Sequence, residues 1–192
     1  MKWIKVIPIV FLAFCGIVSG QDSTIIGKSP AKIEIKTLKA DSNIYADLQN
    51  MKGQVVLLDF WATWCGPCIQ AFPHMNDLVV KYKNKPLKII SITYEPESKI
   101  IPFLEKKELN TIVAIDNDFH TFRAYNAWAI PNIVMIGKDG KLAGRIHPNK
   151  LTEAVIDELL EGKIPKVEQT PENLFKPAEA EKYFRSTLEE KK

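Results

Sequence analysis

Hydrophobic and polar positions follow two different periods along the chain. The segment Val55–Phe60 is apolar except for Asp59, a pattern typical of a strand in a sheet that is covered on both faces. Apolar runs predict further strands at 33–36, 87–93, 111–115, 132–136 and 142–146, and helical spacing predicts helices at 66–82, 97–107, 118–125 and 150–161, with a short helix or turn at 43–48.

The order of these elements indicates the fold class. Strands and helices alternate through most of the chain, which predicts parallel βαβ units. The last two strands are instead joined by Lys138–Lys141, a sequence typical of a hairpin. We therefore predict an α/β fold with a mixed central sheet and helices on both faces.

The composition is that of a single globular domain. The chain has 192 residues, of which 46% are hydrophobic and 26% are charged, so it can bury a full core. Nine glycines and twelve prolines show no regular spacing, which excludes a collagen-like chain and a low-complexity chain. The net charge of +3 comes without a basic cluster, so we expect no nucleic-acid partner.

The first twenty residues have the pattern of a secretory signal peptide. Lys2 and Lys5 precede an apolar run at 6–18, which small residues follow before a polar stretch. As a helix this run would reach about 20 Å, which is short of a hydrocarbon core of about 30 Å. We expect export, with cleavage near Gly20; a lipid anchor on Cys15 is the less favoured alternative.

The C-terminal segment differs from the rest of the chain. Residues 164–192 are rich in charge and contain three prolines, while Ala180, Phe184 and Leu188 recur at the spacing of one helix face. This indicates a linker and a terminal helix that docks on the domain, or alternatively a tail that binds a partner or is loosely ordered. The domains are then 1–20, 21–163 and 164–192.

The cysteine count points to redox chemistry. Without the signal peptide only Cys65 and Cys68 remain. A structural disulfide in an oxidising compartment usually closes a long loop, because its stabilising effect grows with the residues enclosed. A spacer of two residues closes almost no loop, so this pair is better suited to opening and closing than to stabilising the fold.

The two cysteines occupy different positions on the expected helix. Cys65 follows the buried strand and begins the helix, where free N–H groups favour a thiolate, so it is the expected attacking sulfur. Cys68 lies one turn further on and is the expected resolving sulfur. Pro67 suits the first helical turn, whereas Pro73 should kink the helix.

No metal or cofactor is expected. One Cys-x-x-Cys motif supplies two of the four ligands of a zinc site, and the three histidines, His74, His120 and His147, are scattered along the chain. We expect His74 to be a solvated surface residue.

The motifs resemble those of exported TlpA/ResA-like proteins in the thioredoxin superfamily. The resemblance covers about 26–162 and includes Gly27–Ala31, Trp64 with Cys65-Gly-Pro-Cys68 and Pro73, and Ile130-Pro131 before the final hairpin. It implies a thioredoxin-like fold with an inserted helix after Thr93. It also implies a cis bond before Pro131, which would face the cysteines, while Ile130 and Trp64 would help to bind substrate.

Two departures from the family pattern concern proton transfer. Ala71 stands where many of these proteins have a glutamate, and Asp59 stands where thioredoxins have a buried aspartate. We predict that Asp59 takes the proton from Cys68; the alternative is a purely structural, hydrogen-bonded Asp59. Trp128 is expected to pack in the core or, alternatively, to form part of an apolar docking rim.

These features predict an exported thiol-disulfide oxidoreductase that works through a redox-active Cys65–Cys68 disulfide. The resemblance implies reduction of disulfides in client proteins, a membrane thiol-disulfide electron donor, the bacterial periplasm and a role in cytochrome c maturation. The alternatives are an oxidase or isomerase with the same cysteines, or a metal-binding or redox-inactive module on the same fold.

Overall fold

The computed structural model describes residues 25–33, 35–38, 51–171 and 176–189. Six strands form one sheet in the order β1-β4-β3-β2-β5-β6. The strands are β1 (Lys36–Thr37), β2 (Val55–Phe60), β3 (Leu87–Thr93), β4 (Ile112–Ile115), β5 (Asn132–Ile136) and β6 (Leu142–Ile146). β2, β3 and β4 run parallel, whereas β1, β5 and β6 pair antiparallel, which confirms the predicted mixed sheet.

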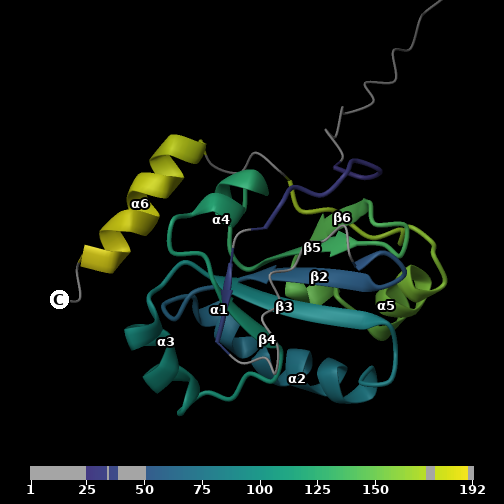
Figure 1. Ribbon diagram of the computed structural model, residues 1–192, viewed down its shortest axis with the longest axis horizontal. Coiled ribbons are helices and arrows are strands. Elements are labelled where there is room, and N and C mark those ends of the chain that lie inside the picture. The colour runs from purple at the N-terminus through teal and green to yellow at the C-terminus, as the bar shows by residue number, and fades with distance from the viewer. Residues whose placement is uncertain (1–24, 34, 39–50, 172–175, 190–192) are drawn as a thin grey trace, which may run out of the picture.

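Helices cover both faces of this sheet (Figure 1). They are α1 (Gly66–Gln70), α2 (Phe72–Lys81), α3 (Glu97–Leu104), α4 (His120–Ala124), α5 (Glu153–Leu160) and α6 (Pro177–Glu189), with a short 3-10 turn, η2, at Pro148–Lys150. α2 and α5 lie together, since the Tyr82 hydroxyl donates to Asp157 at 2.9 Å. α4 lies on the opposite face, and α6 packs beside it (Figure 1).

Strand β2 is buried along its whole length because helices pack on both of its faces. The ring of Phe60 meets Phe122 of α4 edge-on at 5.0 Å. Trp61, the next residue, meets Phe72 of α2 at 5.2 Å and Phe103 of α3 at 5.9 Å. Aromatic packing therefore holds the end of β2 in place just before the chain enters the following loop.

The predicted helix at 66–82 is divided in two. α1 ends at Gln70, Ala71 caps it, and α2 begins at Phe72 with Pro73 in its first turn. Proline lacks the N–H that would continue the helical ladder to the Ile69 carbonyl, but it fits well in a first turn. The predicted kink is thus a break between two helices.

The first strand is shorter than predicted and begins at Lys36 rather than at Ile33. β1 holds only Lys36 and Thr37, while Ile33 and Ile35 are buried without being part of it. The turn expected at 43–48 and the signal peptide lie outside the described residues. In the part of the chain that is described, each helix is too short or too polar to cross a membrane.

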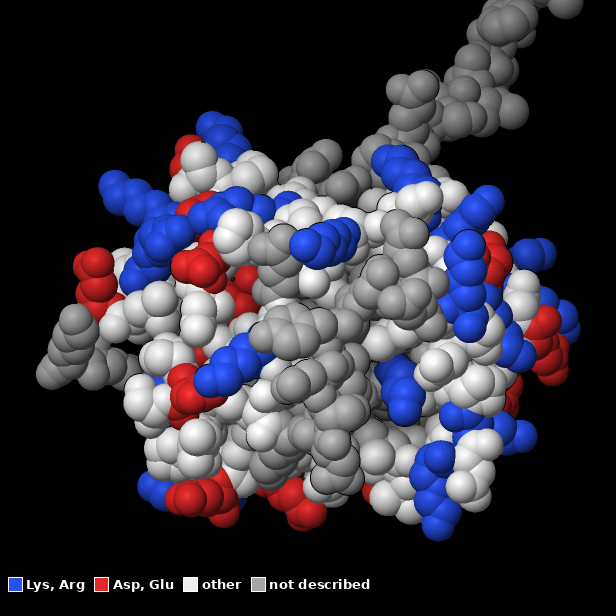
Figure 2. All heavy atoms as spheres, in the orientation of Figure 1, with Lys and Arg blue, Asp and Glu red and all other residues white. Residues whose placement is uncertain are grey.

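Basic and acidic side chains are interspersed over the face shown in Figure 2. This agrees with the nearly balanced totals of 26 Lys and Arg against 23 Asp and Glu.

Candidate active site

A short loop after β2 carries the candidate site. Trp61, at its start, is fully buried, and its backbone N–H donates to the Ile92 carbonyl of β3 at 3.0 Å. The Cys65 N–H donates to the Ala62 carbonyl at 3.0 Å, which closes the loop into a turn. Cys65 is then the N-cap of α1, as the sequence predicts, with Pro67 in the first turn.

Cys65 and Cys68 form a disulfide with an S–S length of 2.00 Å and Cα atoms 5.3 Å apart. The Cys68 N–H donates to the Cys65 sulfur at 3.3 Å. In the disulfide form the two residues are almost equally buried, at 4% and 3% exposure, so exposure does not distinguish them. The hydrogen bond does, because an N–H aimed at the Cys65 sulfur stabilises negative charge there.

Trp64, directly before the cysteines, is partly exposed and held from three sides. Its indole N–H donates to the Tyr94 hydroxyl at 2.7 Å. Its ring also meets two aromatic rings of α6 edge-on, Tyr183 at 5.9 Å and Phe184 at 5.7 Å. The orientation of this tryptophan therefore depends on both the residue after β3 and the C-terminal helix.

The peptide bond between Ile130 and Pro131 is cis. Ile130, Trp64 and Trp128 line one hollow of about 460 Å³, so the fold brings two of the predicted substrate-binding residues together. Trp128 is itself only 3% exposed and packs on Phe119 at 5.9 Å. Both roles considered for Trp128 are thus compatible, since it packs in the core and also lines an apolar surface.

Asp59 lies near the C-terminal end of β2, a central strand of the sheet, and pairs there with Ser91 of β3. Its carboxylate accepts a hydrogen bond from the Ser91 hydroxyl at 2.8 Å, and Ser91 accepts one from Thr111 at 2.8 Å. Burial raises the pKa of Asp59 from 3.8 to about 6, and the Ser91 hydrogen bond opposes this shift only in part. Asp59 can therefore gain or lose a proton close to neutral pH.

Glu95 is a second buried carboxylate, which sequence reasoning missed. It accepts hydrogen bonds from the Thr63 N–H at 2.5 Å and the Thr63 hydroxyl at 2.8 Å, and it forms an ion pair with Lys99. It thus fixes the loop two residues before Cys65. Neighbouring parallel strands end at the same edge of a sheet. The position of Glu95 just after β3 therefore indicates that this carboxylate lies near the loop that follows β2.

The histidines do not form a cluster. His74 is exposed, as predicted, but its Nε2 also lies 2.6 Å from the Leu151 carbonyl. Among the described residues, no three histidine, cysteine or acidic side chains are grouped closely enough to hold a metal ion.

The sequence is similar to known redox proteins. The profile of the AhpC/TSA family matches residues 27–145. The thiol-disulfide oxidoreductase ResA of a Bacillus cereus strain is 31% identical over 158 residues, covering 82% of this chain and 87% of the relative. ResA of Bacillus subtilis (strain 168) is 30% identical, covering 69% of this chain and 68% of the relative.

The fold is similar to solved structures as well. A proposed thiol:disulfide interchange protein DsbE from Chlorobium tepidum superposes with a TM-score of 0.55 at 26% identity, covering 71% of this chain and 98% of that one.

Proposed function

The chain belongs to the AhpC/TSA family and to the ResA-like thiol-disulfide oxidoreductases, and from this premise we propose that it reduces disulfide bonds of client proteins outside the cytoplasm. The observation that carries the proposal is the Cys65–Cys68 pair at the start of α1, with the Cys68 N–H directed at the Cys65 sulfur. That arrangement favours Cys65 as the nucleophile.

The reaction has two exchange steps. The Cys65 thiolate attacks one sulfur of the client disulfide, that S–S bond breaks, and the other client cysteine leaves as a thiolate. Cys68 then loses its proton and attacks the Cys65 sulfur, which releases the second client thiolate. Two electrons have passed to the client, whose thiolates take up two protons, and the protein is left with the Cys65–Cys68 disulfide.

We assign the proton of Cys68 to Asp59 in the second step. A carboxylate whose pKa is raised to about 6 is a better proton acceptor than an ordinary one, because a base works best when its pKa lies near the working pH. Ile130 and Pro131 are proposed to face the cysteines and to bind the client backbone beside them. Trp64 would contact the client next to Cys65.

The reducing direction is supported by the Gly-Pro dipeptide between the cysteines, which thioredoxin shares. We expect a reduction potential nearer the thioredoxin value of about −270 mV than the strong-oxidant value of about −120 mV. Equilibration with glutathione buffers measures it. A potential above about −150 mV would overturn the reductase and favour the oxidase.

The roles of the two sulfurs are tested by trapping. Cys68→Ser should accumulate mixed disulfides between Cys65 and client proteins, because the resolving thiol is missing, whereas Cys65→Ser should trap few. Non-reducing electrophoresis with mass spectrometry detects the adducts and names the clients. Equal trapping by both variants would contradict the assignment.

Export, a membrane dithiol donor and a place in cytochrome c maturation complete the proposal. They are supported by the signal-like residues 1–20 and by the resemblance to exported reductases. Sequencing the N-terminus of the mature protein tests export, with a start near Gln21 expected. An intact Met1 in the cytoplasmic fraction would contradict it.

A further inference from the structure

The C-terminal helix α6 lies against the candidate active site. Phe184, only 3% exposed, packs against Trp64 at 5.7 Å, Tyr94 at 5.0 Å and Trp128 at 5.7 Å. The matched family profile ends at residue 145, well before this helix. α6 lies outside the matched profile and packs against Trp64, the residue that adjoins Cys65.

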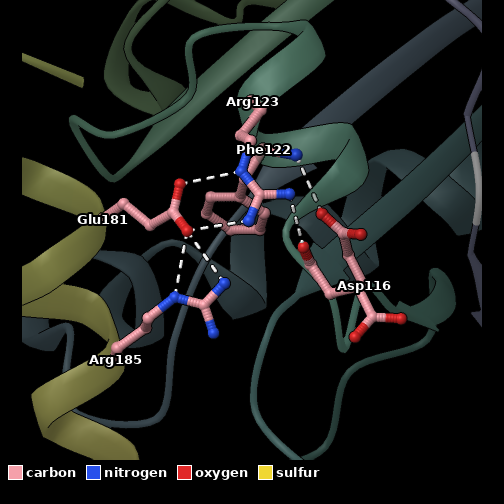
Figure 3. A network of polar contacts seen from close by, with 6 residues as sticks. Asp116, Phe122, Arg123, Glu181 and Arg185 are labelled. Carbon is pink, nitrogen blue, oxygen red and sulfur yellow. Dashed lines mark hydrogen bonds and ion pairs between the residues drawn. The ribbon is translucent and has the colours of Figure 1, made fainter. Parts of the chain in front are cut away.

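Charged side chains fix α6 to α4. Glu181 of α6 accepts two hydrogen bonds from Arg123 of α4, both at 2.7 Å, and Arg185 also donates to it at 2.8 Å (Figure 3). The guanidinium of Arg185 lies 4.8 Å from the centre of the Phe119 ring. Bidentate pairing of this kind specifies the orientation of the two helices.

A chain of hydrogen bonds joins α6 to the tryptophan of the active-site motif. The Thr187 hydroxyl donates to the Phe184 carbonyl at 2.7 Å, so its oxygen is left to accept from the Tyr94 hydroxyl at 2.7 Å. Tyr94 in turn accepts from the Trp64 indole at 2.7 Å. α6 is thus a fixed wall beside the site, joined to it by polar contacts as well as by packing.

A hollow of about 460 Å³ remains between this wall and the domain. Trp64, Trp128 and Ile130 form the domain side, and Ala180 and Tyr183 lie on the α6 side. The volume is in the range of sites that bind small organic groups, about 300 to 1,000 Å³. Among the described residues of the lining only Glu179 is charged, and its side chain is exposed.

We propose that this hollow binds one large apolar side chain of the client, next to the cysteine that Cys65 attacks. The inference rests on the proposed function and names the class of client sequence that the site selects. The lining of the hollow includes Trp64, which adjoins Cys65, and Ile130, which adjoins the cis-proline, so the hollow lies beside the place proposed for a client chain bound at the cysteines. Its apolar walls favour an aromatic or large aliphatic side chain over a polar or charged one.

Short peptides with a single activated cysteine test this. Each carries Phe, Ser or Asp directly before or directly after the cysteine, whose sulfur is bonded to thionitrobenzoate. The Cys65 thiolate of the reduced full-length protein attacks the peptide sulfur, and coloured thionitrobenzoate leaves. Cys68 then releases the peptide thiol and restores the Cys65–Cys68 disulfide, so electrons and atoms balance.

The quantity compared is the ratio of second-order rate constants for the Phe and Ser peptides, in which the intrinsic reactivity of Cys65 cancels. We expect a ratio of about ten for the wild type, as for other hydrophobic pockets, with Asp slowest. Tyr183→Ala removes part of the wall, and Ala180→Leu fills part of the hollow; both should bring the ratio towards one. Tyr183→Phe and the neighbouring Lys182→Ala should keep it.

The outcomes separate two failures. A wild-type ratio near one, or a ratio that neither Tyr183→Ala nor Ala180→Leu lowers, overturns the hollow as a client site and leaves the reductase in place. Failure of the reduced wild type to react with any peptide overturns the proposed function, and the hollow's role with it.

Discussion

Two buried carboxylates lie near the ends of neighbouring parallel strands, and their surroundings differ. Asp59 of β2 is 5% exposed and accepts one hydrogen bond from a neutral hydroxyl, that of Ser91. Glu95, just after β3, is fully buried, accepts two hydrogen bonds from Thr63 and is paired with the cation of Lys99. Similar burial therefore leaves one charge weakly compensated and the other well compensated.

The different surroundings of Asp59 and Glu95 suit the two carboxylates to different roles. Among the described residues no cation pairs with Asp59, and desolvation by burial raises its pKa to about 6. An acid with a cation and two donors is instead a fixed structural anchor, here for the loop that presents Cys65. Proton transfer and loop positioning are thus divided between two residues.

The largest expected effect concerns the anchor. Glu95→Ala leaves Lys99 and the Thr63 N–H without their buried partner, which should lower the free energy of unfolding by about 3 kcal/mol. The expected loss lies in the lower part of the range for removing one partner of a buried ion pair, because the Lys99 side chain is 24% exposed and can turn to water. Urea denaturation of the oxidised protein measures the change.

Thr63→Val is the matched control for this prediction. It removes only the hydroxyl hydrogen bond to Glu95 and keeps the backbone one, so a loss of about 1 kcal/mol is expected. Equal losses in the two variants would mean that neither the Lys99 pair nor the backbone hydrogen bond from Thr63 adds to the anchor.

The second effect is kinetic and concerns the proton of Cys68. Asp59→Asn keeps the shape of the side chain but cannot take up a proton, so release of the client from the mixed disulfide should slow about a hundredfold near neutral pH. Single-turnover release of a peptide thiol, followed from about pH 6 to pH 9, measures this step.

Ser91→Ala sharpens the same experiment. It keeps the Asp59 carboxylate and removes the hydrogen bond that lowers its pKa, so the pH dependence should move to higher pH with the maximal rate retained. If Asp59→Asn releases the peptide at the wild-type rate throughout, Asp59 is structural and water takes the proton from Cys68.

Local sequence patterns predicted much of the fold. The apolar run at Val55–Phe60 and the segments Leu87–Thr93, Asn132–Ile136 and Leu142–Ile146 have the predicted bounds. The ends of these strands depend on turn residues that adjoin them in the sequence, so the local sequence is sufficient to predict where each strand begins and ends.

Contacts between distant segments were not predictable in the same way. The link from Glu95 to Thr63 spans 32 positions and exists only because β3 is placed beside β2. Similarly, the apolar face with Ala180 and Phe184 predicted a docked helix but not where it docks. Aromatic residues from several elements meet at that place, and only the complete fold brings them together.

The last expected effect is a pH-dependent gain in stability. The pKa of Asp59 is about 6 in the folded protein and 3.8 as the ordinary value, so ionising it costs the folded state more than the unfolded state. The wild type is therefore relatively most stable below about pH 4 and loses this contribution as the pH rises to about 6.

Asp59→Asn has no such ionisation. Its free energy of unfolding should exceed that of the wild type by about 3 kcal/mol above about pH 7, and the difference should vanish near about pH 4. Denaturation of both oxidised proteins across this range measures it. A difference that does not change with pH would mean that the charge of Asp59 is compensated in the fold, as that of Glu95 is, and the contrast between the two carboxylates would be wrong.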